Sequence, residues 1–508
     1  MTNNAIYDLD YNGRHIDTGK WPKNSITLSP RVGFTWDVFG DQSLKVRGGT
    51  GLFTGRLPLV FFTNMPTNSG MVQYKAQLNA TQKIIDGYTG PYIKNDKNDK
   101  LIDMSVFRGG LVTDANGHAT TAALQEKLAS LGYPMTITPE EGTAPISISG
   151  VDPNFKMPEV WKTSIGVDYA VPVNFPLTVS GEFVFDKTVY SSVIREWHTP
   201  YVGEFAQFNG ADSRYIYPVG YKKSICDTEA YMLENTSKGY GYTATLTVNA
   251  RPWEWIDLMA SYTHKSYKEL TSLPGSDASS VLNYMSTVNG PNYARLHNSR
   301  NGYPDRFIVS ANLHDKCGNH YSFILEGQRG YSSYSYMTTN DMNGDGYNFD
   351  ALYVPTDEQV ANGDFRFKSD DDRDRFMAFV HANSSLEKQQ GKYCEAYSLY
   401  SPWLARLDFA YKHDFKLNVG KTMHKLQLSF DMKNVLNFFN NEWGIGKGLN
   451  TALGTDGARL LKYEGADAQG YATFSTPKAV NGNTPLFTTN YSLGQCWYAS
   501  IGVKYFFN

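Results

Sequence analysis

The most regular feature of the chain is an alternation of apolar and polar residues over short stretches. In the segment 160–171, VWKTSIGVDYAV, nearly every second residue is apolar or aromatic, and lysine, serine and aspartate lie between them. The segments 404–415 (LARLDFAYKHDF) and 425–433 (KLQLSFDMK) repeat this pattern. Successive side chains of a β-strand point to opposite faces, so a period of two predicts strands with one apolar and one polar face.

Eleven strands are expected from this alternation. They are 27–37, 43–53, 160–171, 177–188, 240–250, 255–266, 305–314, 319–328, 402–415, 425–436 and 495–507. A twelfth strand would have to lie in 54–159 or 189–239, where the pattern is weak. Helical periodicity is scarce, and the clearest case is the short segment TTAALQEKLASLG at 120–132.

The connections between these strands alternate between short and long along the whole chain. The short ones are FGDQS, PVNFP, RPWE, DKCGN and KLNVGKTMH, and the long ones cover 54–159, 189–239, 267–304, 329–401 and 437–494. In an up-and-down antiparallel barrel this order places all tight turns on one rim and all long loops on the other, as in outer-membrane barrels. A soluble β-sandwich or propeller would also alternate, but its loop lengths would not segregate by rim. The pattern therefore favours an all-β, antiparallel transmembrane barrel with long extracellular loops.

Composition supports this prediction and narrows the function classes. The 508 residues include 35 Tyr and 28 Phe, which suits the aromatic girdles of a membrane barrel, and the net charge of −3 does not suggest a nucleic-acid partner. No apolar run is long enough for a transmembrane helix. The start, MTNNAIYDLDYNGRHIDTG, has no apolar core of a signal peptide. Either the protein is cytosolic, or Met1 is not the true start of the mature product.

The four cysteines are scattered along the chain and no catalytic motif is found, so neither feature points to a specific reaction. Cys226 and Cys394 could form a bridge, or all four cysteines could be free thiols. There is no HExxH and no GxSxG in the sequence, so we expect no enzyme activity. The charged run KSDDDRDRF at 368–376 is expected to be a solvated loop with internal ion pairs.

Several motifs resemble those of Oar-like TonB-dependent outer-membrane transporters, with the SusC-type transporters as the nearest competing subfamily. The motifs are SPRVGFTWDVFGDQSLKVRGGTGLFTGR (29–56), PEVWKTSIGVDYAVP (158–172), DRFIVSANL (305–313), EGQRGYSSYSY (326–336), DMNGDGYNFDALYVP (341–355) and FDMKNVLNFFNNEWG (430–444). The last strand, ending in Phe507 and Asn508, also resembles the signal that the barrel-assembly machinery reads, apart from the added Asn508.

The resemblance implies nutrient uptake across the bacterial outer membrane, with outer-membrane lipid, the TonB complex and a surface lipoprotein as partners. It also implies a signal peptide, a TonB box, a plug domain and a barrel of about 22 strands. Neither plug nor box is recognisable here, so we expect 1–26 to be a loop or strand remnant and 27–508 to be the C-terminal part of the barrel. The alternative is a standalone porin or surface adhesin.

The stretch 341–355 begins with the spacing of a calcium loop. Asp341, Asn343 and Asp345 stand at the first, third and fifth positions, glycine follows at the sixth, and Tyr347 would offer its carbonyl oxygen at the seventh. The twelfth position holds Leu352 in place of the bidentate glutamate, so a sensor EF-hand is excluded, and Asp350 or water would have to complete the ligands. We expect either a structural Ca²⁺ clip in an extracellular loop or residues that only form tight turns.

Aromatic residues cluster in the two last long loops. They are Tyr331, Tyr334, Tyr336, Tyr347 and Phe349 around the calcium-like stretch, and Trp443, Tyr463 and Tyr471 in the final loop. Such rings could stack on sugars or grip peptide side chains. The other interpretation, which we favour slightly, is that they form a small core within the loops themselves.

Overall fold

The computed structural model describes residues 3–67, 144–199, 202–221, 228–275, 277–330, 333–420 and 422–507, with short pieces between 69 and 142 and residue 226. Its main element is one antiparallel sheet in which the eleven predicted strands follow each other in chain order. They are β1 (Arg31–Asp37), β2 (Leu44–Thr54), β6 (Glu159–Ala170), β7 (Leu177–Glu196), β9 (Tyr240–Trp253), β10 (Ile256–Glu269), β12 (Asp305–His314), β13 (Asn319–Arg329), β20 (Leu404–Val419), β21 (Thr422–Lys433) and β26 (Tyr498–Phe507). All eleven predictions are confirmed.

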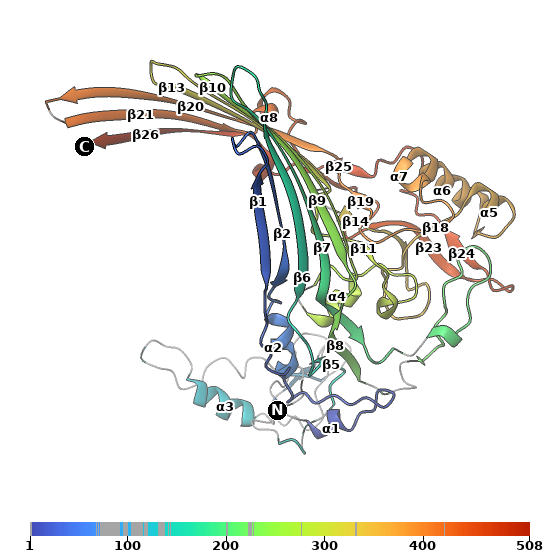
Figure 1. Ribbon diagram of the computed structural model, residues 1–508. Helices are drawn as coiled ribbons and strands as arrows, with labels where there is room; N and C mark the ends of the chain where they lie inside the picture. Colours follow the sequence, from blue (N-terminus) through green and yellow to red (C-terminus); the bar gives the residue numbers. More distant parts are fainter. Residues whose placement is uncertain are drawn as a thin grey trace.

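The sheet is strongly curved but open, and β1 and β26 form its two edges in the described part of the chain. In Figure 1 the tight turns gather at the upper and left-hand ends of the strands, and the long connections fill the lower and right-hand parts. We call the turns at 38–43, 171–176, 254–255 and 315–318, together with the turn at Gly420, the short-turn rim. The predicted segregation of loop lengths is therefore confirmed.

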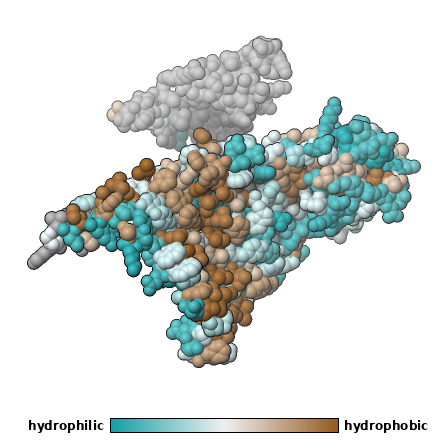
Figure 2. All heavy atoms as spheres, turned by 90° about the horizontal axis from the view of Figure 1, so that it is seen from above, coloured by the Kyte–Doolittle hydropathy of each residue, from teal (hydrophilic) through white to brown (hydrophobic). Residues whose placement is uncertain are grey.

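One face of the sheet is apolar across strand after strand, because the registers align the apolar positions. Val309 of β12 lies opposite Ala260 of β10 and Leu325 of β13, and the next apolar pair on β12 and β13 is Ala311 with Phe323. These side chains point away from the sheet and stay partly exposed, Val309 at 42%. Figure 2 shows apolar residues in a continuous band through the middle of the molecule, with a mostly hydrophilic region to the right.

The opposite face carries paired charges. The Arg47 guanidinium contacts Asp168 at 3.1 Å and Glu182 at 3.0 Å, bridging three neighbouring strands. Polar residues on this face and an exposed apolar surface on the other are what a bilayer requires of a barrel wall with a wet lumen.

Aromatic side chains mark both ends of the apolar band. Near the short-turn rim, Trp253 stacks on Trp255 with 5.4 Å between ring centroids. At the loop end, Trp403 lies 5.6 Å from Phe307. β12 has 10 residues. At about 3.3 Å per residue and a tilt near 40°, it spans about 25 Å, the usual height of the lipid-facing band.

Some local predictions need correction. The connection KLNVGKTMH is mostly strand, because β20 continues to Val419 and β21 begins at Thr422. The run KSDDDRDRF is not a loop: Ser369 caps helix α6 (Asp370–Ala382), whose first turn holds three aspartates. An N-cap serine followed by acidic residues is a helix start signal, since both favour the positive end of the helix. The expected internal ion pairs do form, for example Arg373 with Asp370 at 2.7 Å.

Other elements are short. The predicted helix at 120–132 is found as α3 (Thr121–Ser130). Residues 3–26 contain helix α1 (Asn4–Tyr7) and no strand, and Ile6, Tyr11 and Ile16 are buried against β5 (Ser147–Val151) and β8 (Glu229–Thr236). No helix in the described segments could cross a membrane. All four cysteines are free, so the Cys226–Cys394 bridge is not formed.

The long connections on the side opposite the short-turn rim fold together. We call residues 197–236, 270–304, 330–403 and 434–497 the outer cap. Its helices and strands are η2 (Val202–Glu204), α4 (Ala278–Asn283), η4 (Pro291–Tyr293), β11 (His297–Asn298), β14 (Ser333–Tyr334), β15 (Tyr336–Thr339), β16 (Tyr353–Val354), α5 (Asp357–Ala361), β17 (Arg366–Phe367), α7 (Ser384–Glu387), β18 (Lys392–Tyr393), β19 (Leu399–Tyr400), α8 (Val435–Phe439), β22 (Lys447–Leu449), β23 (Ala458–Ala466), β24 (Ala472–Ser475), β25 (Phe487–Thr489) and η5 (Leu493–Gln495), in addition to α6 and β8. The first long connection holds α2 (Val60–Thr67), β3 (Tyr92–Lys94) and β4 (Lys100–Ile102) as well as α3 and β5.

A sheet of four short strands joins two of these loops. β15 pairs in parallel with β23, and β17 pairs in parallel with β24. These backbone pairings join the loop 330–403 to the loop 434–497. Beneath them lies a hydrophobic core that includes Phe376, Phe379 and Leu460, all fully buried. The outer cap therefore has its own core and is not a set of independent loops.

Candidate functional site

The calcium-like stretch lies at the centre of the outer cap. Asp341 accepts hydrogen bonds through Oδ1 from the backbone N–H groups of Gly344 at 2.8 Å and Asp345 at 3.1 Å. Its Oδ2 accepts from the Gly346 N–H at 2.8 Å. Asp345 Oδ1 in turn accepts from the Tyr347 N–H at 2.8 Å. Carboxylates that accept from the following backbone amides stabilise a tight turn.

The same stretch connects to other parts of the cap. The Tyr217 N–H donates to the Asn343 carbonyl at 2.7 Å, and the Tyr221 hydroxyl donates to the Asp345 carbonyl at 2.6 Å. The Tyr347 hydroxyl donates to Glu196, the last residue of β7, at 2.8 Å. The stretch thus joins the loop 330–403 to the loop 197–236 and to the wall of the sheet.

Asp350 belongs to a buried ion-pair cluster that the sequence alone did not reveal. Arg214 is fully buried and binds Asp212 with two hydrogen bonds of 2.9 Å. It also donates to Asp350 Oδ1 at 2.9 Å and to the Ala351 carbonyl at 2.8 Å. The Tyr393 hydroxyl completes the cluster with a 2.8 Å bond to Asp212. Every contact is charge-assisted and shielded from water, so the cluster fixes one loop against another.

Asp345 is a buried carboxylate in this region. It is 3% exposed, and in the described part of the chain it forms no ion pair with Arg, Lys or His. Burial raises its pKa well above the usual range, and the nearby Asp350 and Asp341 carboxylates add to this effect. Burial likewise raises the pKa of Asp350 to about 7, although the Arg214 guanidinium acts in the opposite direction. A cation near Asp345 would therefore relieve an electrostatic cost.

The predicted calcium ligands are brought to one turn, but many of their oxygens already have partners. Asp341 accepts three backbone N–H groups, Asn343 Oδ1 accepts from the Asp345 N–H at 3.2 Å, and Asp350 is held by Arg214. Within the described residues no group of three or more His, Cys, Asp or Glu side chains is arranged as a metal site. The Ca²⁺ clip formed by Asp341, Asn343, Asp345, Tyr347 and Asp350 remains a prediction. It is motivated by the charge of Asp345.

Calcium and acid should each stabilise this stretch. The folded pKa values of Asp345 and Asp350 lie above their unfolded values. The ionised carboxylates therefore cost stability at neutral pH, and this cost falls as the pH drops through the raised pKa values toward about 4. We expect backbone hydrogen exchange of 341–350, corrected for its intrinsic pH dependence, to slow from pH 8 to pH 5 in chelator. Millimolar calcium should slow it at pH 8.

The matched control is Asp345→Asn, which removes the charge and keeps the shape. It should exchange more slowly than the wild type at pH 8 in chelator, show a smaller pH response and lose the calcium response. Equal wild-type exchange in calcium and chelator would leave Asp341, Asn343 and Asp345 as turn-forming residues.

A cavity of about 510 Å³ lies beside this stretch, between three loops of the outer cap. Its lining residues come from 270–304, 330–403 and 434–497: Pro274, Tyr284, Arg300, Asn301, Ser333, Tyr334, Phe349, Tyr397, Thr455 and Asp456. Phe349 meets Tyr284 edge to face at 5.4 Å, and Arg459 lies over the Phe349 ring at 5.1 Å. The cavity combines aromatic rings with one guanidinium and one carboxylate, which suits a ligand with both apolar and polar groups.

The loop aromatics divide between the two roles predicted for them. Tyr336 and Tyr347 are 1% and 6% exposed and form core, as the loop-packing interpretation requires. Tyr334 and Phe349 line the cavity, as the ligand interpretation requires. Tyr471 lies under Arg366 at 3.7 Å, and Tyr463 packs on Phe474. Trp443 is exposed. Tyr331 lies outside the described residues.

Sequence reasoning missed the other cavity residues, Tyr284, Arg300, Tyr397 and Asp456. They come from three loops and share no local motif. The only available signal was their position on connections assigned to the same rim.

Two solved structures match the chain at low identity and low TM-score. The outer membrane transporter YddB from Escherichia coli is 10% identical with a TM-score of 0.38, and the match covers 94% of this chain and 41% of that one. The siderophore receptor PiuA from Acinetobacter baumannii is 8% identical with a TM-score of 0.30, covering 94% of this chain and 35% of that one. The present chain thus spans less than half the length of either protein. No curated protein matches it.

The sequence itself matches a family over most of its length. Residues 3–451, which contain every strand of the main sheet except β26, match the family described as outer membrane beta barrel domain. The all-β fold class and the location in the bacterial outer membrane are therefore confirmed, and lipid is the medium around the apolar face. The chain belongs to the outer membrane beta barrel domain family.

Proposed function

We propose that the intact protein imports a nutrient across the outer membrane and is driven through TonB, in the manner of Oar-like and SusC-related transporters. The observation that carries this proposal is the cavity that lies between three loops of the outer cap. A passive porin needs an open mouth, whereas a concave site with aromatic and charged groups selects a ligand. The substrate class stays open among peptides, glycans and metal chelates.

The other partners follow from the same proposal. Coupling would run through a plug domain on a longer protein, of which this chain would be the C-terminal part of the barrel. A surface lipoprotein would dock over the outer cap, and the last strand, β26, would engage the barrel-assembly machinery. The competing function is that of a standalone porin or surface adhesin.

Energy dependence separates these two functions. Uptake of the nutrient, found by growth on a panel of oligopeptides, glycans and metal chelates, should fall by at least an order of magnitude when TonB is deleted. Passive diffusion through a porin would not change. Undiminished uptake without TonB would contradict the proposal.

Substitution of the cavity aromatics should weaken uptake. Phe349→Ala and Tyr334→Ala each remove a ring contact worth about 1 kcal/mol, so the half-saturation concentration should rise about fivefold. Tyr471→Ala is the matched control, because this ring lies in the same cap but under Arg366 and away from the cavity. If Tyr471→Ala has the same effect, the cap acts only as a folded unit and the cavity is not the ligand site.

A further inference from the structure

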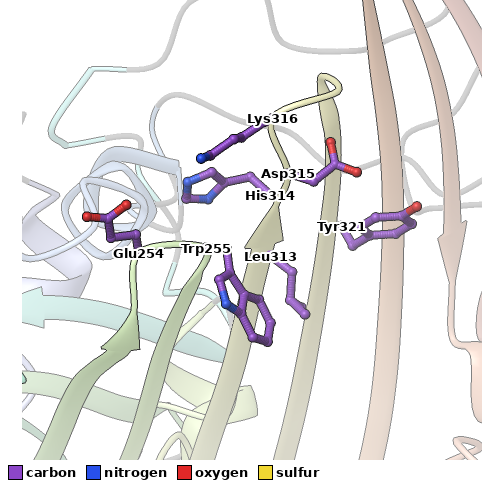
Figure 3. A pocket seen from close by; sticks show the side chains of 7 residues that line it. All are labelled: Glu254, Trp255, Leu313, His314, Asp315, Lys316 and Tyr321. Carbon is purple, nitrogen blue, oxygen red and sulfur yellow. The ribbon is translucent and has the colours of Figure 1, made fainter.

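A second cavity lies at the opposite end of the strands, on the short-turn rim. It has a volume of about 440 Å³ and lies between the turn that joins β9 to β10 and the turn that joins β12 to β13. Its lining residues, shown in Figure 3, are Glu254, Trp255, Leu313, His314, Asp315, Lys316 and Tyr321. β10, β12 and β13 lie in the interior of the sheet, so each is paired on both sides. The cavity is therefore not a product of an open sheet edge.

The floor of this rim cavity is apolar and continues the lipid-facing side of the sheet. Leu313 and Tyr321 lie opposite each other in the register of β12 and β13, in line with Val309. Figure 3 shows the Trp255 indole beside Leu313. Trp255 remains 47% exposed, and the His314 N–H donates to the Trp255 carbonyl at 2.9 Å, which links the two turns. An acyl chain can therefore reach the floor from the bilayer.

The mouth of the rim cavity carries one cation and one anion that are free to bind. In Figure 3 Lys316 and His314 extend toward the side where Glu254 lies, whereas Asp315 points away. The Asp315 carboxylate is engaged in its own turn, where it accepts from the Cys317 and Asn319 N–H groups, both at 2.9 Å. Neither Lys316 nor Glu254 belongs to an ion pair among the residues that the structure describes.

We propose that the rim cavity binds one phospholipid with a zwitterionic headgroup from the periplasmic leaflet. The Lys316 ammonium would meet the lipid phosphate, and the Glu254 carboxylate would meet the headgroup ammonium. The first methylenes of an acyl chain would lie along Leu313 between the Trp255 and Tyr321 rings. Tyrosine and tryptophan favour this depth of the membrane, and lysine near the surface attracts lipid phosphate.

This site is independent of the nutrient that the outer cap selects. The two cavities lie at opposite ends of the strands, and short turns of outer-membrane barrels face the periplasm. A lipid held between the β9–β10 and β12–β13 turns would tie two neighbouring hairpins together at the inner surface of the membrane.

Native mass spectrometry can test the proposal. The protein is placed in nanodiscs of phosphatidylethanolamine and phosphatidylglycerol at equal amounts and is then released into mild detergent. The wild type should retain one phosphatidylethanolamine molecule. Lys316→Ala and Trp255→Ala should each lower the retained fraction about fivefold, the equivalent of about 1 kcal/mol. Glu254→Gln should abolish the preference over phosphatidylglycerol.

Trp36→Ala is the matched control, because Trp36 is 59% exposed at the same rim and does not line the cavity. It should retain the lipid as the wild type does, and the heat-dependent shift in gel mobility should show that all variants are folded. The proposal is overturned if retention is unchanged in Lys316→Ala and Trp255→Ala. It is also overturned if Trp36→Ala loses the lipid equally, or if phosphatidylglycerol is the lipid retained.

Discussion

Replacing Arg214 with methionine is expected to destabilise the outer cap by about 3–5 kcal/mol, because it leaves buried carboxylates without their cation. Arg214 has no exposed surface in its side chain, and both Asp212 and Asp350 depend on it. The loss should be visible as faster hydrogen exchange in 336–354 and as early protease cleavage of the loop 330–403. The strands of the main sheet should keep their protection.

Arg373→Met is the matched control, since Arg373 also contacts two carboxylates, those of Asp370 and Asp374, but on the surface of α6. Exposed ion pairs are screened by water and contribute little, so this variant should unfold almost as the wild type does. Adding Asp212→Asn and Asp350→Asn to Arg214→Met should recover part of the lost stability, because the uncompensated charges are then gone. Equal stability of Arg214→Met and Arg373→Met would show that the buried cluster does not hold the cap.

Adjacent residues of β12 should respond in opposite ways to a new charge. Val309→Arg places a guanidinium on the lipid-facing side near the middle of the strand, which should cost about 2–4 kcal/mol. Ser310→Arg places it on the other face, beside a hollow of about 300 Å³ that Asn312 and Asp257 also line. This second change should cost little. Reversible unfolding in lipid vesicles measures both values.

The comparison of these two variants tests the barrel directly. In a soluble β fold the face that is apolar here would form the core and the polar face would meet water. Arginine at position 309 would then be costly for a different reason, but detergent and lipid would not be required for folding. A variant at position 310 that costs as much as the one at 309 would contradict a wet lumen.

The main sheet could be predicted from the sequence because each strand is governed by a local rule. Val309 is apolar and its neighbour Ser310 is polar, and this alternation can be seen without knowing the rest of the fold. A period of two therefore predicts the strand. The extra length of β20 and β21 was missed since Lys416, Asn418 and Thr422 made their common turn look like a polar loop. All three nevertheless lie in strands, and next to them Lys425 of β21 pairs with Asp414 of β20 at 2.6 Å.

The outer cap could not be predicted, because its organisation depends on partners far apart in the chain. Arg214 meets Asp350 across 136 positions, and no spacing rule connects them. Helix α6 did have a local signal, Ser369 followed by three aspartates, but the density of charge was interpreted as a solvated loop. The spacing at 341–346 left a calcium clip and a tight turn open, and the structure brings these residues into one turn. Their burial under Tyr217 and Tyr221 required the fold.

The parallel pairing of β15 with β23 also constrains the order of events during biogenesis. β15 lies in the connection between β13 and β20 and reaches the cell surface with it. β23 lies in the connection between β21 and β26 and therefore reaches the surface later, after β21 has been inserted. Until then the face of the loop 330–403 that pairs with β23 and β24 lacks these strands on the outside of the cell. The outer cap can therefore be completed only after the loop 434–497 has crossed the membrane. A closed cap then indicates that translocation of the loops has ended. Antibodies against this face would then recognise stalled assembly intermediates and not the finished protein.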